Sequence, residues 1–227
     1  MKQGDGVAIA LLFVWYDAKM KKQVIFISGG DSFNKREDFL AYLRTTPLRE
    51  PLGDRTVRWP DTLRSELGED YEVYLPTMPN KFNARYDEWA IWLERHLDLV
   101  EDGVILIGWS LGGMFLAKYL SETPLKKQVS AAYLLAAPGG EFVDGSGGGG
   151  DCVDFRPLAT AVAKLGTLIP HLEIWQSEDD FVVPVTEVEW YRTHIPEAKI
   201  TIFKDKNHFL VESLPELIAA IKKTESN

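Results

Sequence analysis

The sequence contains a single cysteine, Cys152, in 227 residues. One cysteine excludes a disulfide within the chain, and disulfides are typical of proteins that fold in oxidising compartments. We therefore expect a reducing compartment and a cytoplasmic location. Cys152 follows the run GSGGGGD, which is typical of a flexible loop, so we do not expect this thiol to be catalytic.

An excess of basic residues and a long apolar run are also missing. The formal net charge is −9 at pH 7 with no cluster of Lys and Arg, which argues against nucleic acid or an anionic membrane as a partner. The apolar run VAIALLFVWY at 7–16 has about half the length of a membrane-spanning helix. We expect residues 1–19 to be an N-terminal extension or an extra edge strand, with a natural start at Met20 as the other interpretation.

What the sequence does have is a regular alternation of strands and helices. Six short, mostly apolar runs are predicted as strands: 24–27, 72–75, 104–108, 131–136, 172–176 and 199–204. Runs that are apolar throughout are typical of parallel strands covered on both faces. The pattern predicts an α/β fold, with a doubly wound and mostly parallel sheet of about six strands flanked by helices, in one domain over residues 20–227.

Two helices have readable boundaries in the sequence. Phe82, Tyr86 and Trp89 fall on one face at helical spacing, which predicts an amphipathic helix over 81–97. Near the C-terminus, Ser213 followed by Glu216 three residues later predicts an N-cap with a capping box.

The segment GWSLGG, residues 108–113, joins the apolar run VILI to the helical pattern MFLAKYL. Gly-x-Ser-x-Gly between a strand and a helix is the pattern of a nucleophile elbow, a tight turn that exposes the serine hydroxyl. The glycines allow neighbouring backbone to approach closely. We expect Ser110 to be a nucleophile at the start of a helix.

A serine hydroxyl needs a base, and in this type of fold the base is a histidine late in the chain. His208 lies in a predicted loop between the last strand and the last helix, where no structural role is evident. The other three histidines have ordinary explanations: His96 lies in a helix, His171 opens a strand and His194 ends a helix. We expect His208 to be the base.

The acid that orients the histidine should follow an earlier strand. Four polar residues follow the strand at 172–176: Ser177, Glu178, Asp179 and Asp180. The residues themselves leave the choice open between Asp179 and Asp180, because aspartate is also a common turn residue.

The motifs together resemble the α/β-hydrolase superfamily, and most of all the small serine hydrolases typified by retinoblastoma-binding protein 9 and its bacterial relatives. The segments VIFISGG, YEVYLPTMPNKFNARYDEWAIWL, VILIGWSLGG, SEDDFVVP and FKDKNHF carry this resemblance. It implies an α/β-hydrolase fold with a small or minimal lid. It also implies a Ser110–Asp180–His208 triad and an oxyanion hole formed by the backbone N–H groups of Gly30 and Leu111.

The sequence departs from the family pattern at two positions. Ser28 stands where a histidine is common, and Asn207 stands where a glycine usually precedes the histidine. Asparagine tolerates a left-handed backbone better than most residues, so His208 can still be presented correctly.

These observations predict a serine hydrolase that cleaves a small-molecule carboxylic ester, with an amide as the second choice, through an acyl-enzyme. No cofactor and no metal are expected. The alternative is a binding protein that keeps the fold but has lost turnover.

Overall fold

The structure, a computed structural model, describes residues 20–47, 56–140 and 150–224. The predicted extension at 1–19 lies outside these described residues. The sheet has six strands: β1 (Lys22–Ile27), β2 (Tyr71–Tyr74), β3 (Val104–Trp109), β4 (Val129–Leu135), β5 (His171–Ser177) and β6 (Lys199–Phe203). Their order is β2-β1-β3-β4-β5-β6, and every neighbouring pair is parallel. All six predicted strands are confirmed.

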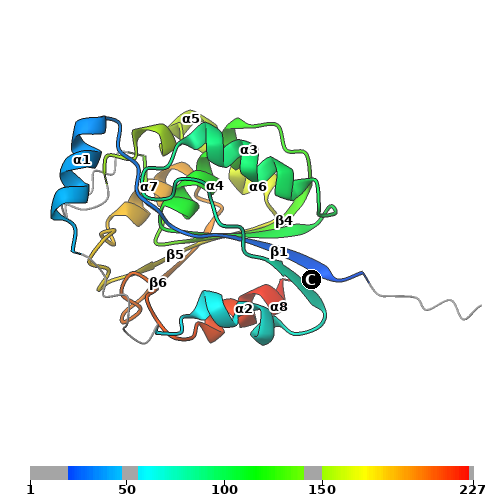
Figure 1. Ribbon diagram of the computed structural model, residues 1–227. Helices are drawn as coiled ribbons and strands as arrows, with labels where there is room; N and C mark the ends of the chain where they lie inside the picture. The colour runs from blue at the N-terminus through cyan, green and yellow to red at the C-terminus, as the bar shows by residue number, and fades with distance from the viewer. Residues whose placement is uncertain (1–19, 48–55, 141–149, 225–227) are drawn as a thin grey trace, which may run out of the picture.

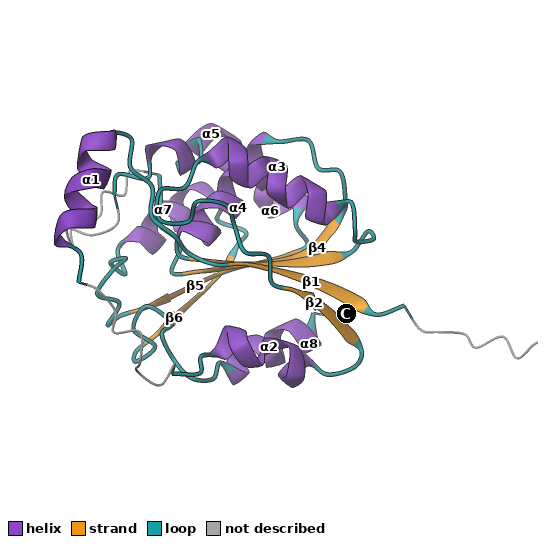
Figure 2. Cartoon of the chain, in the orientation of Figure 1, coloured by secondary structure: helices purple, strands orange, loops and turns teal. Residues whose placement is uncertain are grey.

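Helices cover both faces of this sheet (Figures 1 and 2). On one face lie α2 (Trp59–Leu67) and α8 (Pro215–Lys223). On the other lie α3 (Tyr86–Leu97), α4 (Leu111–Glu122), α5 (Ala159–Val162), α6 (Leu165–Leu168) and α7 (Glu187–His194). The 3-10 turn η1 (Val153–Phe155) packs into the core of the same face through Phe155. The helix α1 (Arg36–Thr45) lies at the left end of the sheet in Figure 1 and buries none of its residues. The predicted doubly wound architecture is confirmed.

The hydrophobic core is divided by the sheet into two clusters. Successive residues of a strand point to opposite faces, and β3 shows this directly. Leu106 packs with the cluster under α3 and α4, whereas Ile105 and Ile107 pack with the cluster under α2 and α8. A strand that supplies both clusters has to be apolar at every position, which explains the uninterrupted run VILI.

The predicted start of the first amphipathic helix is wrong. The helix α3 begins at Tyr86, and Phe82 is mostly exposed rather than part of its apolar face. The backbone forms a turn before the helix, because Asn80 has a positive φ of 47° and its carbonyl accepts the N–H of Asn83. The N–H of Ala84 donates to the carbonyl of Asp31, and this hydrogen bond joins the turn to the loop after β1.

The predicted N-cap at Ser213 is also wrong. The helix α8 begins at Pro215, and the carbonyl of Leu214 accepts the first helical N–H groups. Proline favours the first position of a helix because its φ is fixed and it has no N–H to satisfy. Glu216 pairs with Lys206 at 2.8 Å instead of closing a capping box.

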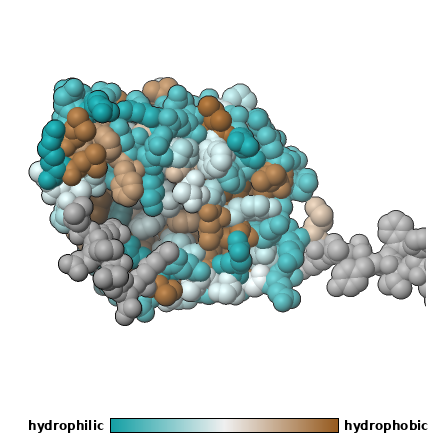
Figure 3. Space-filling model, in the orientation of Figure 1, coloured by the Kyte–Doolittle hydropathy of each residue, from teal (hydrophilic) through white to brown (hydrophobic). Residues whose placement is uncertain are grey.

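On the face drawn in Figure 3, hydrophobic residues form separate patches among hydrophilic ones. No helix within the described residues is long and apolar enough to span a membrane.

The sheet order determines where a ligand can bind. The chain runs from β1 outwards to β2 and then returns to β3 on the other side, so the order reverses between β1 and β3. In parallel sheets, ligands bind outside the carboxyl ends of the strands at such a reversal. The segments that leave β1 and β3 at this edge are Ser28–Gly30 and Ser110–Leu111.

Candidate active site

Ser110 occupies a strained turn between β3 and α4. Its φ is 58° and its ψ is −125°, a conformation that residues other than glycine rarely adopt. The turn is held by hydrogen bonds: the N–H of Ser110 donates to the carbonyl of Leu135, and its carbonyl accepts the N–H groups of Gly113 and Met114. The predicted strand–serine–helix arrangement is therefore present, and the strain is balanced by specific contacts.

The glycines of this turn allow close packing of backbone on backbone. A Cβ atom at Gly112 would collide with the carbonyl oxygens of Ile27 and Ser28, which end β1 and begin the next loop. A Cβ atom at Gly108 would lie 2.5 Å from the carbonyl oxygen of Gly112. The first turn of α4 thus packs directly against the end of β1.

The loop after β1 reaches the serine. A Cβ atom at Gly29 would lie 3.4 Å from Oγ of Ser110, and one at Gly30 would lie 2.6 Å from the carbonyl oxygen of Lys81. Within the described residues, neither the N–H of Gly30 nor the N–H of Leu111 has a hydrogen-bond acceptor. Two free backbone donors therefore lie in the segments on either side of the hydroxyl.

Asp180 and His208 form a buried pair. Nδ1 of His208 lies 2.9 Å from Oδ2 and 3.1 Å from Oδ1 of Asp180. The Asp180 side chain is 0% exposed and the His208 side chain 8%. Oδ1 of Asp180 also accepts the N–H groups of Val182 at 2.8 Å and Val183 at 2.9 Å.

This arrangement sets the tautomer of the imidazole. A carboxylate accepts hydrogen bonds, so the contact favours the tautomer in which the Nδ1–H group of His208 donates to Asp180. In the neutral ring, Nε2 is then the atom that can accept a proton.

Asp179, the other candidate for the acid, has different partners. Its Oδ1 accepts the hydroxyl of Ser177 at 2.6 Å and the N–H of Asn207 at 2.8 Å. The hydrogen bond from Ser177, supported by that from Asn207, lowers the pKa of the Asp179 carboxyl. Asp180 therefore contacts the imidazole of His208, whereas Asp179 contacts the backbone N–H of Asn207, the residue before it.

The remaining histidines lie in structural settings. Nδ1 of His96 is 2.8 Å from the carbonyl oxygen of Trp92, and Nδ1 of His194 is 2.7 Å from that of Trp190, each within its own helix. His171 opens β5, as expected.

No hydrogen bond joins Ser110 directly to His208, both of which are described, but one residue connects them. The indole N–H of Trp109 donates to the carbonyl of His208 at 2.9 Å, and Trp109 immediately precedes Ser110. Trp59 likewise donates its indole N–H to the carbonyl of Phe209 at 3.1 Å. Sequence reasoning missed both contacts, because no local pattern marks partners so distant in the chain.

Two other features lie apart from this constellation. A surface hollow of about 520 Å³ lies along β2 and includes Arg64 and His96, but none of the candidate catalytic residues. Within the described part of the chain, no group of three or more His, Cys, Asp or Glu residues is arranged to hold a metal ion.

Solved structures of known proteins share this fold. The ydeN gene product of B. subtilis has a TM-score of 0.68 and 18% identity, over 91% of this chain and 100% of that one. A meta-cleavage product hydrolase of Pseudomonas fluorescens has a TM-score of 0.59 and 15% identity, over 92% of both chains. An esterase of Rhodococcus sp. has a TM-score of 0.53 and 15% identity, over 92% of both chains. At these identities the likeness shows the α/β-hydrolase fold alone.

Comparison of the sequence itself gives the family. A search of curated protein sequences finds no match. The family model described as "Serine hydrolase" matches residues 53–215, which is more than half of the chain. This range includes the elbow and both members of the buried carboxylate–imidazole pair. The chain belongs to the serine hydrolase family and is an enzyme of the serine hydrolase type.

Proposed function

We propose that the enzyme cleaves a carboxylic ester of a small molecule through an acyl-enzyme formed on Ser110. The observation that carries the proposal is the buried Asp180–His208 pair, whose loop is hydrogen-bonded to Trp109, the residue that precedes the strained Ser110 at the reversal point of the sheet. A buried carboxylate that orients an imidazole next to a serine hydroxyl is the arrangement that activates serine.

In the first half of the reaction, Oγ of Ser110 attacks the carbonyl carbon while Nε2 of His208 takes the hydroxyl proton. The carbonyl oxygen becomes an oxyanion, and the free N–H groups of Gly30 and Leu111 donate to it. Such preorganised donors stabilise charge that develops only in the transition state. The intermediate then expels the alcohol, which takes the proton from His208, and the acyl group remains on Ser110.

In the second half, His208 takes a proton from a water molecule, and the resulting hydroxide attacks the acyl group. A second oxyanion forms in the same place and collapses to release the carboxylic acid, with the proton returned from His208 to Oγ. Asp180 keeps the imidazole in one tautomer throughout and stabilises its positive charge. The steps use only water as co-reactant.

The choice of an ester over an amide is supported by the esterase among the structures with this fold. We also propose that the protein works in the cytoplasm, because a chain with one cysteine has no disulfide of its own to form in an oxidising compartment. Cell fractionation would test the location.

A panel of short-chain p-nitrophenyl esters and the matching anilides tests the activity, with Ser110→Ala as the control variant. We expect ester turnover to exceed anilide turnover, and the Ser110→Ala variant to lose about 10⁶-fold in kcat. Equal turnover by wild type and variant would overturn the proposal. Binding of an ester without turnover would indicate instead a binding protein with this fold.

A further inference from the structure

The loop that carries His208 has an unusual backbone. Asn207 and Phe209, on either side of the histidine, have positive φ angles of 43° and 53°. A left-handed conformation is tolerated by asparagine but is rare for a bulky residue such as phenylalanine. Such a conformation persists only where surrounding contacts determine it.

One side of the loop is held through its N–H groups by the end of β5. The N–H of Lys206 donates to Oγ of Ser177 at 2.9 Å, and the N–H of Asn207 donates to Oδ1 of Asp179 at 2.8 Å. Ser177 and Asp179 are joined by their own hydrogen bond. These contacts place the beginning of the loop beside the segment that follows β5 and contains Asp180.

The other side of the loop is held through two successive carbonyl groups, each by an indole. Trp109 donates to the carbonyl of His208 at 2.9 Å, and Trp59 donates to the carbonyl of Phe209 at 3.1 Å. The backbone N–H of Trp59 also donates to the carbonyl of Val211 at 3.2 Å. Two indoles from different elements thus converge on the peptide units around the histidine.

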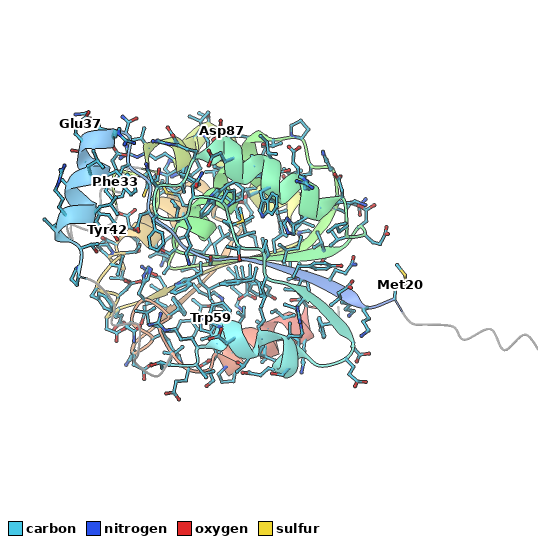
Figure 4. All side chains as sticks on the ribbon, in the orientation of Figure 1. Met20, Phe33, Glu37, Tyr42, Trp59 and Asp87 are labelled. Atoms are coloured by element: carbon cyan, nitrogen blue, oxygen red, sulfur yellow. The ribbon has the colours of Figure 1, made fainter. Side chains whose placement is uncertain are left out.

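The two tryptophans also contact one another. Their ring centroids lie 6.5 Å apart in an edge-to-face arrangement, and the Trp109 ring lies 5.7 Å from the imidazole of His208. Trp59 is 2% exposed and lies at the start of α2, below the sheet in the view of Figure 4. Trp59 therefore packs against Trp109 from the core side. Trp109 joins the turn that contains Ser110 (the serine turn, residues 108–113) to the loop that contains His208 (the histidine loop, residues 204–210).

We propose that Trp59 and Trp109 are positioning residues, which fix the imidazole of His208 relative to Ser110 through these two hydrogen bonds. The inference rests on the proposed function, in which Ser110 and His208 exchange a proton. Proton transfer requires a heavy-atom distance within hydrogen-bond reach, and a displacement of about 1 Å can cost about 100-fold in rate. Trp109 is suited to this because the same residue sets the backbone before Ser110.

The test compares Trp109→Phe and Trp59→Phe with wild type, and uses Trp175→Phe as the matched control. Trp175 is buried on the same face of the sheet, but its indole donates to Glu173 and not to the histidine loop. We expect kcat for ester hydrolysis to fall about 100-fold for Trp109→Phe and about 10-fold for Trp59→Phe, with KM little changed. Trp175→Phe should keep the wild-type kcat.

A second readout does not depend on turnover. The proton shared by His208 Nδ1 and Asp180 should give a downfield proton NMR resonance that is absent in His208→Ala. We expect this resonance to shift or broaden in the Trp109 and Trp59 variants and to stay unchanged in Trp175→Phe. If Trp109→Phe fails to fold, site-specific replacement of Trp109 by benzothienylalanine keeps the shape of the ring and removes only the N–H donor.

The outcomes separate the two proposals. Wild-type kcat and an unchanged resonance in folded Trp109 and Trp59 variants would overturn the positioning role. A wild-type protein without Ser110-dependent turnover would overturn the proposed function, while the resonance would still show whether the indoles hold His208. Equal losses in all three variants would mean a general packing effect and would also overturn the positioning role.

Discussion

The serine turn and the histidine loop both contain residues with a positive φ, and they hold them by different physical means. The serine turn is surrounded by glycines, and its backbone approaches that of β1 because Gly112 has no side chain. The histidine loop contains no glycine between Lys204 and Leu210. Its backbone is held instead by side chains: Asp179 accepts the N–H of Asn207, and the indoles of Trp109 and Trp59 donate to the carbonyls of His208 and Phe209. The serine turn depends on glycines that have no side chain, and the histidine loop depends on side chains that hydrogen-bond to its backbone.

The difference between Asp179 and Asp180 gives the largest expected effect. Asp180→Asn should lower kcat by about 10⁴-fold, because the amide no longer holds the imidazole in the required tautomer. Asp179→Asn should lower kcat by about 10-fold or less, because it weakens the contacts to the Ser177 hydroxyl and the Asn207 N–H but leaves the Asp180–His208 pair in place. Ester kinetics at neutral pH would check both. Similar losses in the two variants would contradict the assignment of separate roles.

A methyl group added to the serine turn should cost stability. Gly112→Ala forces a Cβ atom against backbone oxygens that cannot move aside, so we expect a loss of about 3 kcal/mol in the free energy of unfolding. Gly103→Ala is the control, since Gly103 has a φ of 92° but open space around it. Backbone strain there should cost about 1–2 kcal/mol. Equal losses in urea denaturation would mean that the close backbone contact at Gly112 adds no larger cost than the strain at Gly103, which would contradict the packing account.

Acidification should weaken the tie between Asp179 and the histidine loop. The pKa of Asp179 in the folded protein lies below the ordinary value of 3.8, because Ser177 and Asn207 donate to the carboxylate. A depressed folded pKa adds stability that is fully present above the unfolded pKa and is lost as the pH falls through the folded pKa.

The difference in unfolding free energy between wild type and Asp179→Asn should therefore be constant from about pH 7 to 5 and shrink below about pH 4. Thermal unfolding across this range would measure it. A difference that grows on acidification would have the wrong sign.

The smallest effect is expected at Asn207. Asn207→Gly relieves the positive φ but removes the acceptor for the Leu210 N–H, which lies 2.9 Å from Oδ1. These changes oppose one another, so we expect a change in unfolding free energy within about 1 kcal/mol. Asn80→Gly, at a φ of 47°, is the matched control. A loss well above that of the control would show that the Asn207 side chain, more than the indoles, holds the loop.

The same comparison explains what the sequence could predict. The strands and the serine turn were predictable because their signals are local: apolar runs mark strands that supply both faces of a sheet, and the glycines lie within four residues of Ser110. The histidine loop depends on partners that are distant in the chain. Trp109 lies 99 residues before the residue whose carbonyl it binds, and Trp59 lies 150 residues before its own partner. No window of sequence contains both members of such a pair.

The two wrong helix boundaries have the same cause. Phe82 has the right spacing for the helix that follows, but the N–H of Ala84 is bonded to Asp31 on another segment. Glu216 has the right spacing for a capping box, but its carboxylate forms an ion pair with Lys206 of the histidine loop. In both places the local sequence pattern favours one helix start, and a contact with a distant segment determines another.

The most direct test of the account is the rate at which a fluorophosphonate probe labels wild type and His208→Ala, with the labelled peptide identified by mass spectrometry. If His208 activates Ser110, the label will be on the peptide containing Ser110, and His208→Ala will be labelled at least about 10³-fold more slowly. A label on another residue, or equal labelling rates for the two proteins, would contradict it.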